Sequence, residues 1–460
     1  MDIHHTLLAS AFAREGMVMS NQEFASWFEA RQMESEFEVK HVPIDALDGW
    51  HLDSGHNLTH HTGRFFSVEG LDVLVETPTE ERRWMQPIMR QPEVGILGLL
   101  AQRRRGVLHF LMQAKKEPGN VNGLQLSPCV QATRSNYSRV HNGKATAYLD
   151  YFVSHPTART VVDQLQSEHN ARFLKKRNRN VVVQLPDDEA IETRDGFCWL
   201  TLGQLKHLMR TDNLINMNAR TVLGCLPFPS SGGPASPFAD RFEQALYTSL
   251  VASKSWKSIP DVFGWLTRHK CDTRLVTRLC SVRDVEGWRL AEGIIAHEGG
   301  RYFDVIGVDV RLNHREIAAW QQPLLRQRNK GLVGMILKPI EGVLHMLVRA
   351  RTEAGNIDLV EVGATVQCVP DRIAPQQEPF LEWFTELRGT VRYDVVQSEE
   401  GGRFFHDQNR NVALEVGEDF PLNPPPDFIW LTLGQVKHLI QFSNVLNIGA
   451  RSLMAALSPV

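Results

Sequence analysis

Two continuous apolar runs lie close together in the first half of the chain, at residues 94–101 and 107–114. Both alternating faces of the second run are largely apolar, with Val107 and Leu111 on one side and Leu108, Phe110 and Met112 on the other. Because successive strand residues point to opposite faces, this pattern predicts central strands of a sheet covered on both sides. Similar runs return at residues 332–337 and 343–350.

Helical signals surround these predicted strands. Ser20 or Asn21 can cap a helix that places Phe24, Trp27 and Phe28 on one face, and a similar helix begins at Pro260. Further along the first half we expect a turn at residues 119–120, a strand ending at 131, a helix at 148–152, strands at 166–168 and 181–185, and helices at 203–209 and 213–223. This order predicts an α+β fold in which helices sandwich a mixed β-sheet.

The chain matches itself when it is shifted by about 230 to 240 residues. Residues 197–208, FCWLTLGQLKHL, return as residues 428–439, FIWLTLGQVKHL. A length of 460 residues suits two domains of about 200 residues each. We therefore expect a loosely held N-terminal arm (1–19), repeat 1 (20–226), a linker (227–255) that starts with a stretch rich in proline, glycine and serine, and repeat 2 (256–460).

Composition excludes several classes of protein. The formal charge of −3 provides no large basic surface for nucleic acid, and no apolar stretch is long enough to span a membrane. The 6 cysteines show neither a CxxC pair nor zinc-ligand spacing, as expected for free buried thiols in a reducing compartment. These features predict a cytoplasmic protein.

The most polar duplicated segment covers residues 166–180 and returns at residues 397–411. Arginine binds phosphate oxygens with two parallel hydrogen bonds, and amides can reach sugar or base edges, so this composition suits a nucleotide diphosphate. The candidate binding residues are Glu168, Arg172, Arg177, Asn178, Arg179 and Asn180 in repeat 1, with Arg403, Asn409, Arg410 and Asn411 in repeat 2. Alternatively, these side chains satisfy loop backbone and surface carboxylates, and the residue pattern does not decide between the two.

Two other duplicated polar features favour structural roles. Asn213, Asn216 and Arg220 return as Asn444, Asn447 and Arg451, which suits helix capping and an ion pair across the repeat better than ligand contact. His109 and His345 lie inside the apolar strands, where a single histidine is usually a hydrogen-bonded core residue.

Differences between the repeats are the best guide to catalysis, although a loop can also diverge for packing reasons. His61 aligns with Glu298, and Lys115 aligns with Arg351, which cannot exchange a proton near neutral pH. Tyr137 and Arg139 belong to a segment of repeat 1 without an equivalent in repeat 2. We therefore place catalysis in repeat 1, with Tyr137, His61 and Lys115 as catalytic candidates and Arg139 as a further substrate-binding candidate.

The chain contains no glycine-rich dinucleotide motif, no phosphate-binding GxxxxGK[ST] motif, no HExxH motif and no acidic cluster with magnesium-ligand spacing. We therefore expect chemistry without a cofactor or a bound metal.

The tandem pattern, together with QSExxxRFxxxRNRNVV from residue 166 and FxWLTLGQLKHL from residue 197, closely resembles the NDP-hexose 2,3-dehydratases. The resemblance extends from about residue 20 to the C-terminus. It implies Nudix-like repeats and a homodimer. The glutamate-rich metal-binding helix of Nudix hydrolases is missing, and Gln408 replaces the equivalent of Arg177, which suggests an altered second pocket.

The resemblance also implies a reaction. The substrate is dTDP-4-keto-6-deoxyglucose, whose C-3 proton is acidified by the C-4 ketone. Removal of this proton and loss of the C-2 hydroxyl give an enol that tautomerises to a 3,4-diketo-2,6-dideoxy sugar, used in deoxysugar and antibiotic biosynthesis. The ketone is the electron sink, so no nicotinamide or pyridoxal is required.

Within this reaction, we assign proton transfer to Tyr137 or His61, the developing oxyanion to Lys115 and the diphosphate to the arginines of residues 172–179. An NADPH-dependent 3-ketoreductase is the expected pathway partner, because the diketone product is reactive. Two other functions are compatible with the sequence: a metal-dependent Nudix-like hydrolase of nucleotide sugars, and a sugar-nucleotide-binding protein without catalysis.

Overall fold

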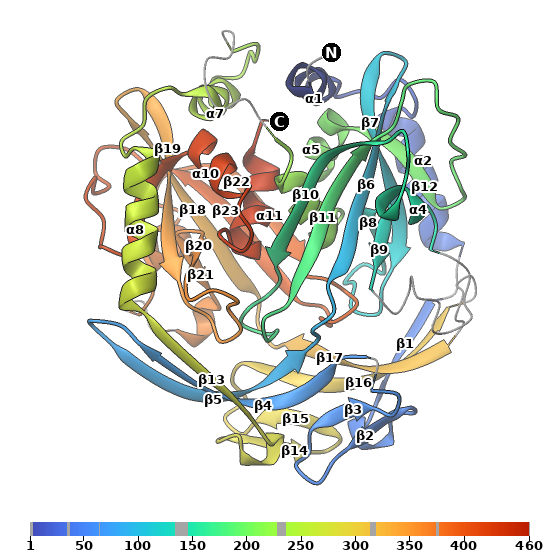
Figure 1. Cartoon of the computed structure of the whole chain (residues 1–460), viewed down its shortest axis with the longest axis vertical. Coiled ribbons are helices and arrows are strands. Elements are labelled where there is room, and N and C mark those ends of the chain that lie inside the picture. The colour runs from blue at the N-terminus through green and yellow to red at the C-terminus, as the bar shows by residue number, and fades with distance from the viewer. Residues whose placement is uncertain are drawn as a thin grey trace.

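The computed structural model describes residues 3–34, 37–63, 65–133, 146–227, 236–312, 319–373 and 377–459. Two large sheets stand side by side in the upper part of the molecule, and smaller sheets lie below them (Figure 1). Each half of the sequence supplies one large sheet. The duplication in the sequence is therefore also a duplication of structure.

The large sheet of the first half has seven strands. They are β6 (Gly95–Arg104), β7 (Val107–Lys116), β8 (Leu124–Pro128), β9 (Val130–Ala132), β10 (Arg159–Ser167), β11 (Arg177–Gln184) and β12 (Phe197–Thr201). β11 runs parallel to β6, whereas β7 is antiparallel to β6 and β10 is antiparallel to β11. The predicted mixed sheet is confirmed, with the two apolar runs as its neighbouring strands β6 and β7.

The large sheet of the second half repeats this topology. Its strands are β18 (Gly331–Ile340), β19 (Val343–Arg351), β20 (Glu361–Gly363), β21 (Val366–Cys368), β22 (Thr390–Ser398), β23 (Gln408–Glu415) and β24 (Phe428–Thr432). Even a local irregularity is shared, since the register shifts between Thr160 and Val162 in β10 and between Val391 and Tyr393 in β22. The α+β class and the repeat are thus confirmed, whereas the Nudix-like assignment stays a prediction.

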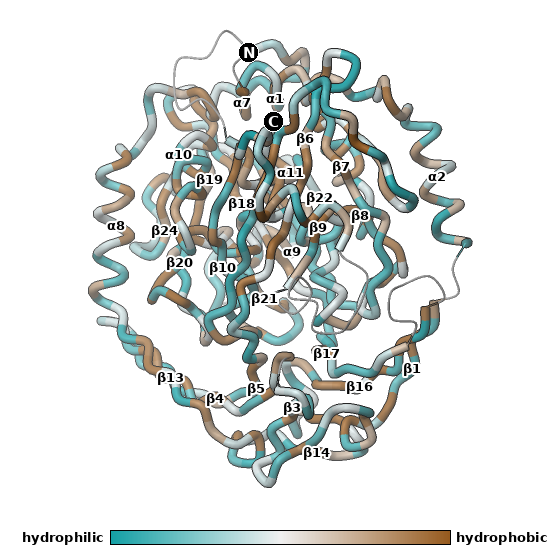
Figure 2. Tube along the Cα trace, turned by 45° about the vertical axis from the view of Figure 1, so that its right-hand side comes forward, coloured by the Kyte–Doolittle hydropathy of each residue, from teal (hydrophilic) through white to brown (hydrophobic). Residues whose placement is uncertain are grey.

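Helices cover the large sheets. They are α1 (Ile3–Phe12), α2 (Asn21–Met33), α4 (Asp150–Val153), α5 (Leu202–Leu208), α6 (Met217–Gly224), α7 (Arg241–Val251), α8 (Ile259–Asp272), α9 (Leu381–Thr385), α10 (Leu433–Leu439) and α11 (Ile448–Leu457). Short 3-10 helices occur at Ile44–Ala46, Val282–Asp284 and Pro370–Arg372. α2 and α8 flank opposite sides of the molecule, and apolar residues gather on the strands between them (Figure 2). No helix in the described ranges is both long and apolar enough to cross a membrane.

Local sequence signals explain several helix ends. Ser20 caps α2 as predicted, because its side chain accepts a hydrogen bond from the Glu23 backbone while the Glu23 carboxylate binds the Ser20 backbone N–H. The helix expected from residue 213 begins later, at Met217. Asn213 adopts a left-handed conformation with φ of 55°, and Asn216 is the residue that caps α6. Capping by the duplicated asparagines is therefore confirmed at Asn216 and Asn447.

The strand histidines are core residues, as predicted. His109 is fully buried, and its Nδ1 lies 2.8 Å from the Val107 carbonyl oxygen. His345 repeats this contact with Val343, and its Nε2 accepts a hydrogen bond from the Trp256 backbone N–H. Burial lowers the pKa of both imidazoles, which favours their neutral form.

The prediction of a loosely held N-terminal arm is wrong. Residues 3–12 form α1, and its Ser10 hydroxyl donates to the Leu108 carbonyl while accepting from the Leu202 backbone N–H. In the predicted linker, α7 docks in the same way, because Ser249 bridges Leu344 and Leu433. Each large sheet therefore has its own docked helix, α1 or α7, which precedes α2 or α8 in the sequence. The sequences of α1 and α7 differ, so the repeat pattern does not reveal that the two helices are equivalent.

The smaller sheets exchange strands between the halves. Their strands are β1 (Phe37–Val42), β2 (Trp50–Leu52), β3 (Leu58–His60), β4 (Ser67–Glu76), β5 (Glu81–Arg90), β13 (Arg274–Cys280), β14 (Trp288–Ala291), β15 (Ile294–His297), β16 (Phe303–Leu312) and β17 (Ala319–Gln327). β1 pairs with β16 of the second half, and β13 pairs with β4 of the first half. The two halves are consequently interlocked, which the repeat pattern alone does not predict.

Two buried arginines join the halves at the centre. Arg220 on α6 donates to the Ser452 hydroxyl at 2.6 Å and to the Ser398 carbonyl at 2.8 Å, and Arg451 on α11 donates to the Thr221 hydroxyl at 2.9 Å and to the Ser167 carbonyl. Both side chains belong to residues with only 1% exposure. The prediction of an ion pair across the repeat is wrong for Arg220 and Arg451. Hydroxyl, amide and carbonyl oxygens, not carboxylates, accept the hydrogen bonds of the two guanidinium groups.

Arg451→Met should lower the free energy of unfolding by about 3 kcal/mol or more, because it leaves several buried oxygen acceptors unpaired. Denaturant titration of the full chain measures this change. Arg410→Met is the matched control, since Arg410 forms a partly exposed ion pair with Asp394 and should cost about 1 kcal/mol or less. Equal losses in the two variants would contradict the central role of Arg451.

Candidate functional site

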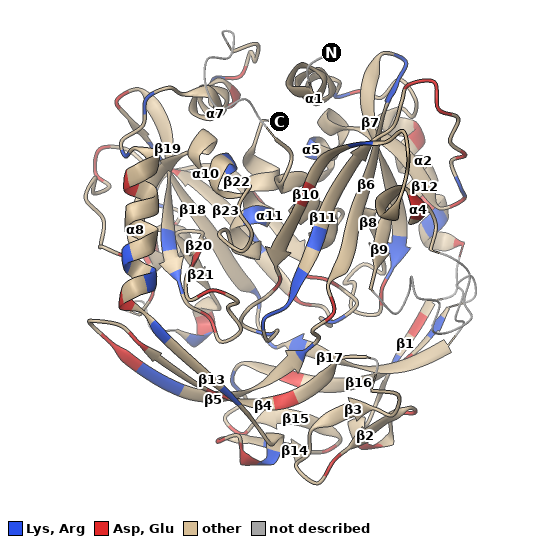
Figure 3. Cartoon of the chain, viewed as in Figure 1, with Lys and Arg blue, Asp and Glu red and all other residues tan. Residues whose placement is uncertain are grey.

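A cavity of about 280 Å³ opens beside the large sheet of repeat 1. Strands β6 and β9 and the segment that follows β7 form one side, and β17 with residues 400–403 of repeat 2 forms another. Basic residues follow the lower part of β11, where it descends toward β17 (Figure 3). The cavity therefore lies between the repeats, although repeat 1 supplies most of its lining.

Residues 399–407 reach this cavity because their loop crosses to the other repeat. The Gly119 N–H donates to the Gly401 carbonyl at 2.7 Å, and the His406 N–H donates to the Gly119 carbonyl at 2.9 Å. A Cβ on Gly119 would lie 1.6 Å from the Phe404 carbonyl oxygen, so this approach requires glycine. Gly355 holds residues 170–175 of repeat 1 in the same way, with a Cβ position 1.8 Å from the Phe173 oxygen.

Positive and negative side chains face one another in the cavity. Lys115 Nζ lies 2.9 Å from Glu117 Oε1, and the Lys176 ammonium donates to the Glu93 carbonyl. Lys115 is the one catalytic candidate from the sequence that lines the cavity within the described ranges. Burial lowers the pKa of the Lys176 ammonium to about 8, so this lysine can exchange a proton near neutral pH.

Two of the predicted binding residues form one polar unit in the wall. Asn178 Nδ2 donates to Glu168 Oε1 at 2.5 Å, and Asn178 Oδ1 accepts from the Gly95 backbone N–H at 3.1 Å. Burial raises the pKa of the Glu168 carboxyl. The amide thus holds Glu168 in place at the start of the crossing segment.

The arginine in this cavity comes from the opposite repeat. Arg403 lines the cavity with its guanidinium carbon 4.4 Å from the centre of the Phe66 ring, and its Nε lies 3.4 Å from Gln91 Oε1. Arg172, its equivalent in repeat 1, instead lies over Phe303 of repeat 2 and donates to Gln327. The crossing loops therefore exchange the two arginines, and Arg172 is not part of the repeat 1 cavity.

The remaining arginines and amides of the duplicated segment do not converge. Arg177 and Arg179 alternate along β11 with Asn178 and Asn180, so the two pairs point to opposite faces of the sheet. Arg179 binds Asp163 at 2.7 Å. In repeat 2, Arg410 binds Asp394, Asn409 donates to Glu399, and Asn411 donates to the Asn409 carbonyl. These contacts fit the alternative structural role, while ligand contact at these positions stays a prediction.

The other catalytic candidates lie elsewhere. His61 is exposed at the turn after β3, with Nδ1 2.9 Å from the Gly49 carbonyl, and it does not line the cavity. Tyr137 and Arg139 lie outside the described residues. Their roles stay predictions.

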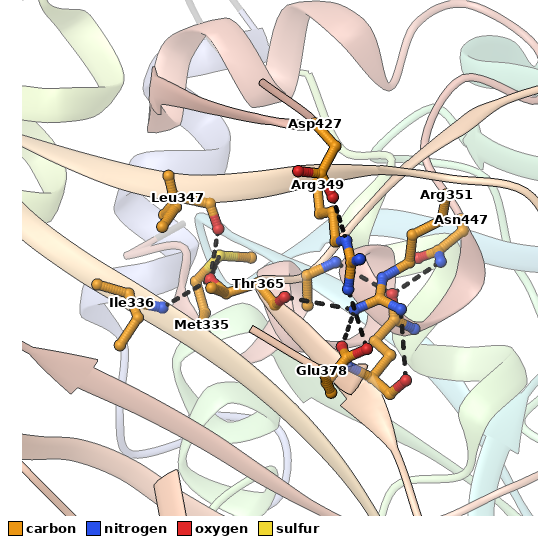
Figure 4. A network of polar contacts seen from close by, with 11 residues as sticks. Met335, Ile336, Leu347, Arg349, Arg351, Thr365, Glu378, Asp427 and Asn447 are labelled. Atoms are coloured by element: carbon orange, nitrogen blue, oxygen red, sulfur yellow. Dashed lines mark hydrogen bonds and ion pairs between the residues drawn. The ribbon is translucent and has the colours of Figure 1, made fainter. Parts of the chain in front are cut away.

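The equivalent position in repeat 2 is filled by an ion-pair network (Figure 4). Arg351, the counterpart of Lys115, binds Glu378, which also accepts from Arg349 at 2.9 Å. Gln367 Oε1 accepts from Asn447 Nδ2 at 2.8 Å. Both residues are thus paired with a carboxylate, but Lys115 with Glu117 lines an open cavity, whereas Arg351 belongs to the network around Glu378.

Several cavity residues were missed in the sequence, namely Glu117, Lys176, Trp320 and Glu400. Lys176 and Glu400 lie in the duplicated segment at positions where the other repeat has Asp407 and His169. Comparison of the repeats could therefore have identified both as positions at which the repeats differ. Glu117 returns as Glu353 and carries no such signal. Trp320 belongs to β17 of repeat 2, and only the crossing of the repeats brings it here.

The described residues include no group of three or more histidine, cysteine, aspartate or glutamate side chains arranged to hold a metal ion. The described cysteines are free thiols, as predicted, but the expectation that they are buried is wrong for Cys271, which is exposed, and for Cys280 and Cys368, which are partly exposed.

Comparison with known proteins agrees with the motifs of the duplicated segment. The profile of the family described as NDP-hexose 2,3-dehydratase matches residues 21–226 and 260–457. A Saccharopolyspora spinosa protein named dTDP-4-dehydro-6-deoxy-alpha-D-glucopyranose 2,3-dehydratase is 45% identical over 455 residues, covering 97% of this chain and 92% of the relative.

Proteins with the same name give similar matches from two other organisms. The relative from Amycolatopsis orientalis is 39% identical, with 99% of this chain and 94% of the relative covered. The relative from Streptomyces violaceoruber is 41% identical, with 94% and 96% covered. The chain therefore belongs to the NDP-hexose 2,3-dehydratase family.

Proposed function

We propose that this chain is a hydro-lyase that converts dTDP-4-keto-6-deoxy-D-glucose into a 3,4-diketo-2,6-dideoxy sugar nucleotide in deoxysugar biosynthesis. Family membership supports the reaction, and the names of its relatives support the dTDP-sugar substrate. We place the active site in the repeat 1 cavity because Lys115, Lys176 and Arg403 line it together with three carboxyl groups. This composition suits an anionic substrate whose reaction requires proton transfer.

Each step of the proposed reaction asks for a specific kind of group. Removal of the C-3 proton moves negative charge onto the C-4 oxygen, where a cationic donor such as the Lys115 ammonium stabilises it. Lys176 and Arg403 are suited to the diphosphate, since both are cations in the cavity wall. Tyr137 stays our candidate for removing the C-3 proton, because His61 does not line the cavity.

The surroundings of the enzyme are also part of the proposal. We expect a homodimer in the cytoplasm and an NADPH-dependent 3-ketoreductase that consumes the reactive diketone. A metal-dependent nucleotide-sugar hydrolase would instead release dTMP, and a protein that only binds sugar nucleotides would leave the substrate intact. These outcomes make the three functions separable in a single assay.

In deuterium oxide, the purified protein should consume dTDP-4-keto-6-deoxyglucose, release no dTMP and introduce solvent deuterium into the sugar ring, because the enol product must gain a proton at C-2. Mass spectrometry with and without the ketoreductase measures the product, and EDTA should leave the rate unchanged. Release of dTMP that EDTA abolishes would support hydrolysis, whereas binding without substrate loss would support a silent binding protein.

Lys115→Met should lower kcat by about 10²- to 10³-fold, because the C-4 oxyanion loses its cationic donor. Steady-state kinetics with dTDP-4-keto-6-deoxyglucose measures the effect. Arg351→Met is the matched control in repeat 2, where the residue is bound to Glu378, and it should reduce stability more than turnover. A larger loss of kcat in the control would move catalysis to repeat 2.

Tyr137→Phe should reduce turnover by about 10²-fold or more while dTDP affinity stays near that of the wild type, because only the proton-transfer group is lost. Kinetics together with calorimetric titration of dTDP separates the two quantities. His61→Ala is the comparison variant, and its exposed position outside the cavity predicts little change. Unchanged turnover in the tyrosine variant would remove Tyr137 from the mechanism.

A further inference from the structure

Glu400 lies in repeat 2 but faces the cavity of repeat 1. Its loop is fixed by the hydrogen bonds between Gly119 and residues 401 and 406. Glu400 is half-buried and lines the cavity together with Lys115, Glu117 and Glu168. A carboxyl group from the opposite repeat is thus placed beside the residues expected to bind and activate the sugar.

The three carboxyl groups of the cavity differ in what they contact. Glu117 is paired with Lys115 at 2.9 Å, and Glu168 is held by Asn178 at 2.5 Å. Glu400 accepts a hydrogen bond from the backbone N–H of Gly402 at 3.0 Å, and no ion pair to its carboxylate is found among the described side chains. Of the three, Glu400 is therefore the carboxyl group best able to carry and release a proton.

The electrostatic surroundings point in the same direction. Burial, together with the neighbouring Glu117, raises the pKa of the Glu400 carboxyl to about 7. Glu168 acts in the same direction, whereas Arg403 and Lys115 act against it. A substantial fraction of Glu400 is consequently protonated at neutral pH, as a general acid requires.

The other repeat lacks such a group at the equivalent position. His169 is the counterpart of Glu400, and its Nε2 lies 2.5 Å from Glu399 Oε2 in a partly buried ion pair. That carboxylate raises the pKa of the His169 imidazole to about 9 against the effect of burial. His169 is therefore held as a charged partner of Glu399, and the carboxyl group that Glu400 brings to the repeat 1 cavity is replaced by an imidazole at this position of the other repeat.

We propose that Glu400 is the general acid that protonates the C-2 hydroxyl as it leaves, so that the catalytic site requires residues of both repeats. This inference rests on the proposed dehydration. The Glu400 O–H bond breaks as a new O–H bond forms on the leaving oxygen, and the C-2–O bond breaks to release water.

Electrons from the former C-3–H bond, held in the C-4 enolate, become the C-2–C-3 double bond. The resulting C-3 enol loses its hydroxyl proton and gains a proton at C-2, and solvent reprotonates Glu400. No oxidant or reductant enters this balance.

Glu400→Gln tests the assignment because the two halves of the reaction can be observed separately. The variant should still exchange the C-3 hydrogen for solvent deuterium, since the base is intact, while loss of the C-2 hydroxyl slows by about 10²- to 10⁴-fold. Binding of dTDP should remain near that of the wild type. Glu298→Gln, at an exposed position of repeat 2, is the matched control and should leave both rates unchanged.

A substrate carrying fluoride at C-2 provides a second readout, because fluoride departs without protonation. The Glu400→Gln variant should process this analogue nearly as fast as the wild type. The wild-type kcat for the natural substrate should also fall as pH rises through about 7, because the acid becomes deprotonated. Glu400→Asp should shift the pH at which this alkaline fall in kcat occurs.

The proposal is overturned by wild-type dehydration in Glu400→Gln, or by loss of both exchange and dehydration while dTDP still binds. If Glu400→Gln does not fold, an unchanged alkaline limb in Glu400→Asp overturns it as well. A wild-type protein that neither exchanges nor dehydrates the substrate would instead refute the proposed function.

Discussion

The reciprocal exchange of backbone and side chains between the repeats is the constraint on which the other features depend. β1 and β13 each complete a sheet of the opposite half, and each crossing loop hydrogen-bonds to a glycine of the opposite half. Arg220 and Arg451 bind buried oxygens across the same boundary. An isolated repeat would leave strand edges and buried carbonyls without partners, so the pair of repeats is the unit that can fold.

This exchange also explains how duplication produced a specialised site. Because the loops cross, the repeat 1 cavity combines a sheet from one repeat with polar groups from the other, so that a change in either repeat alters it. Lys115 lines the cavity beside its partner Glu117, whereas its counterpart Arg351 is bound by Glu378. Glu400 and His169 differ in the same manner, since one faces the repeat 1 cavity and the other is paired with Glu399.

Prediction from the sequence succeeded where a local pattern carries the structural signal. The apolar runs of β6 and β7, the cap at Ser20 and the core position of His109 follow from side-chain periodicity and hydrogen bonding within a few residues. The arm was misjudged because α1 and α7 dock alike through Ser10 and Ser249 although their sequences differ. Arg172 does not line the repeat 1 cavity because its loop crosses to the other repeat.

The duplication, the mixed α+β architecture and the family follow from the amino-acid sequence, because periodicity and long motifs are properties of residues close together along the chain. Which side chains share a cavity depends instead on the three-dimensional packing. Arg403, Trp320 and Glu400 lie more than 200 residues along the chain from Gly95, yet they line one space with it. Such encounters depend on how strands and loops pair across the repeats, and no short stretch of residues records that pairing.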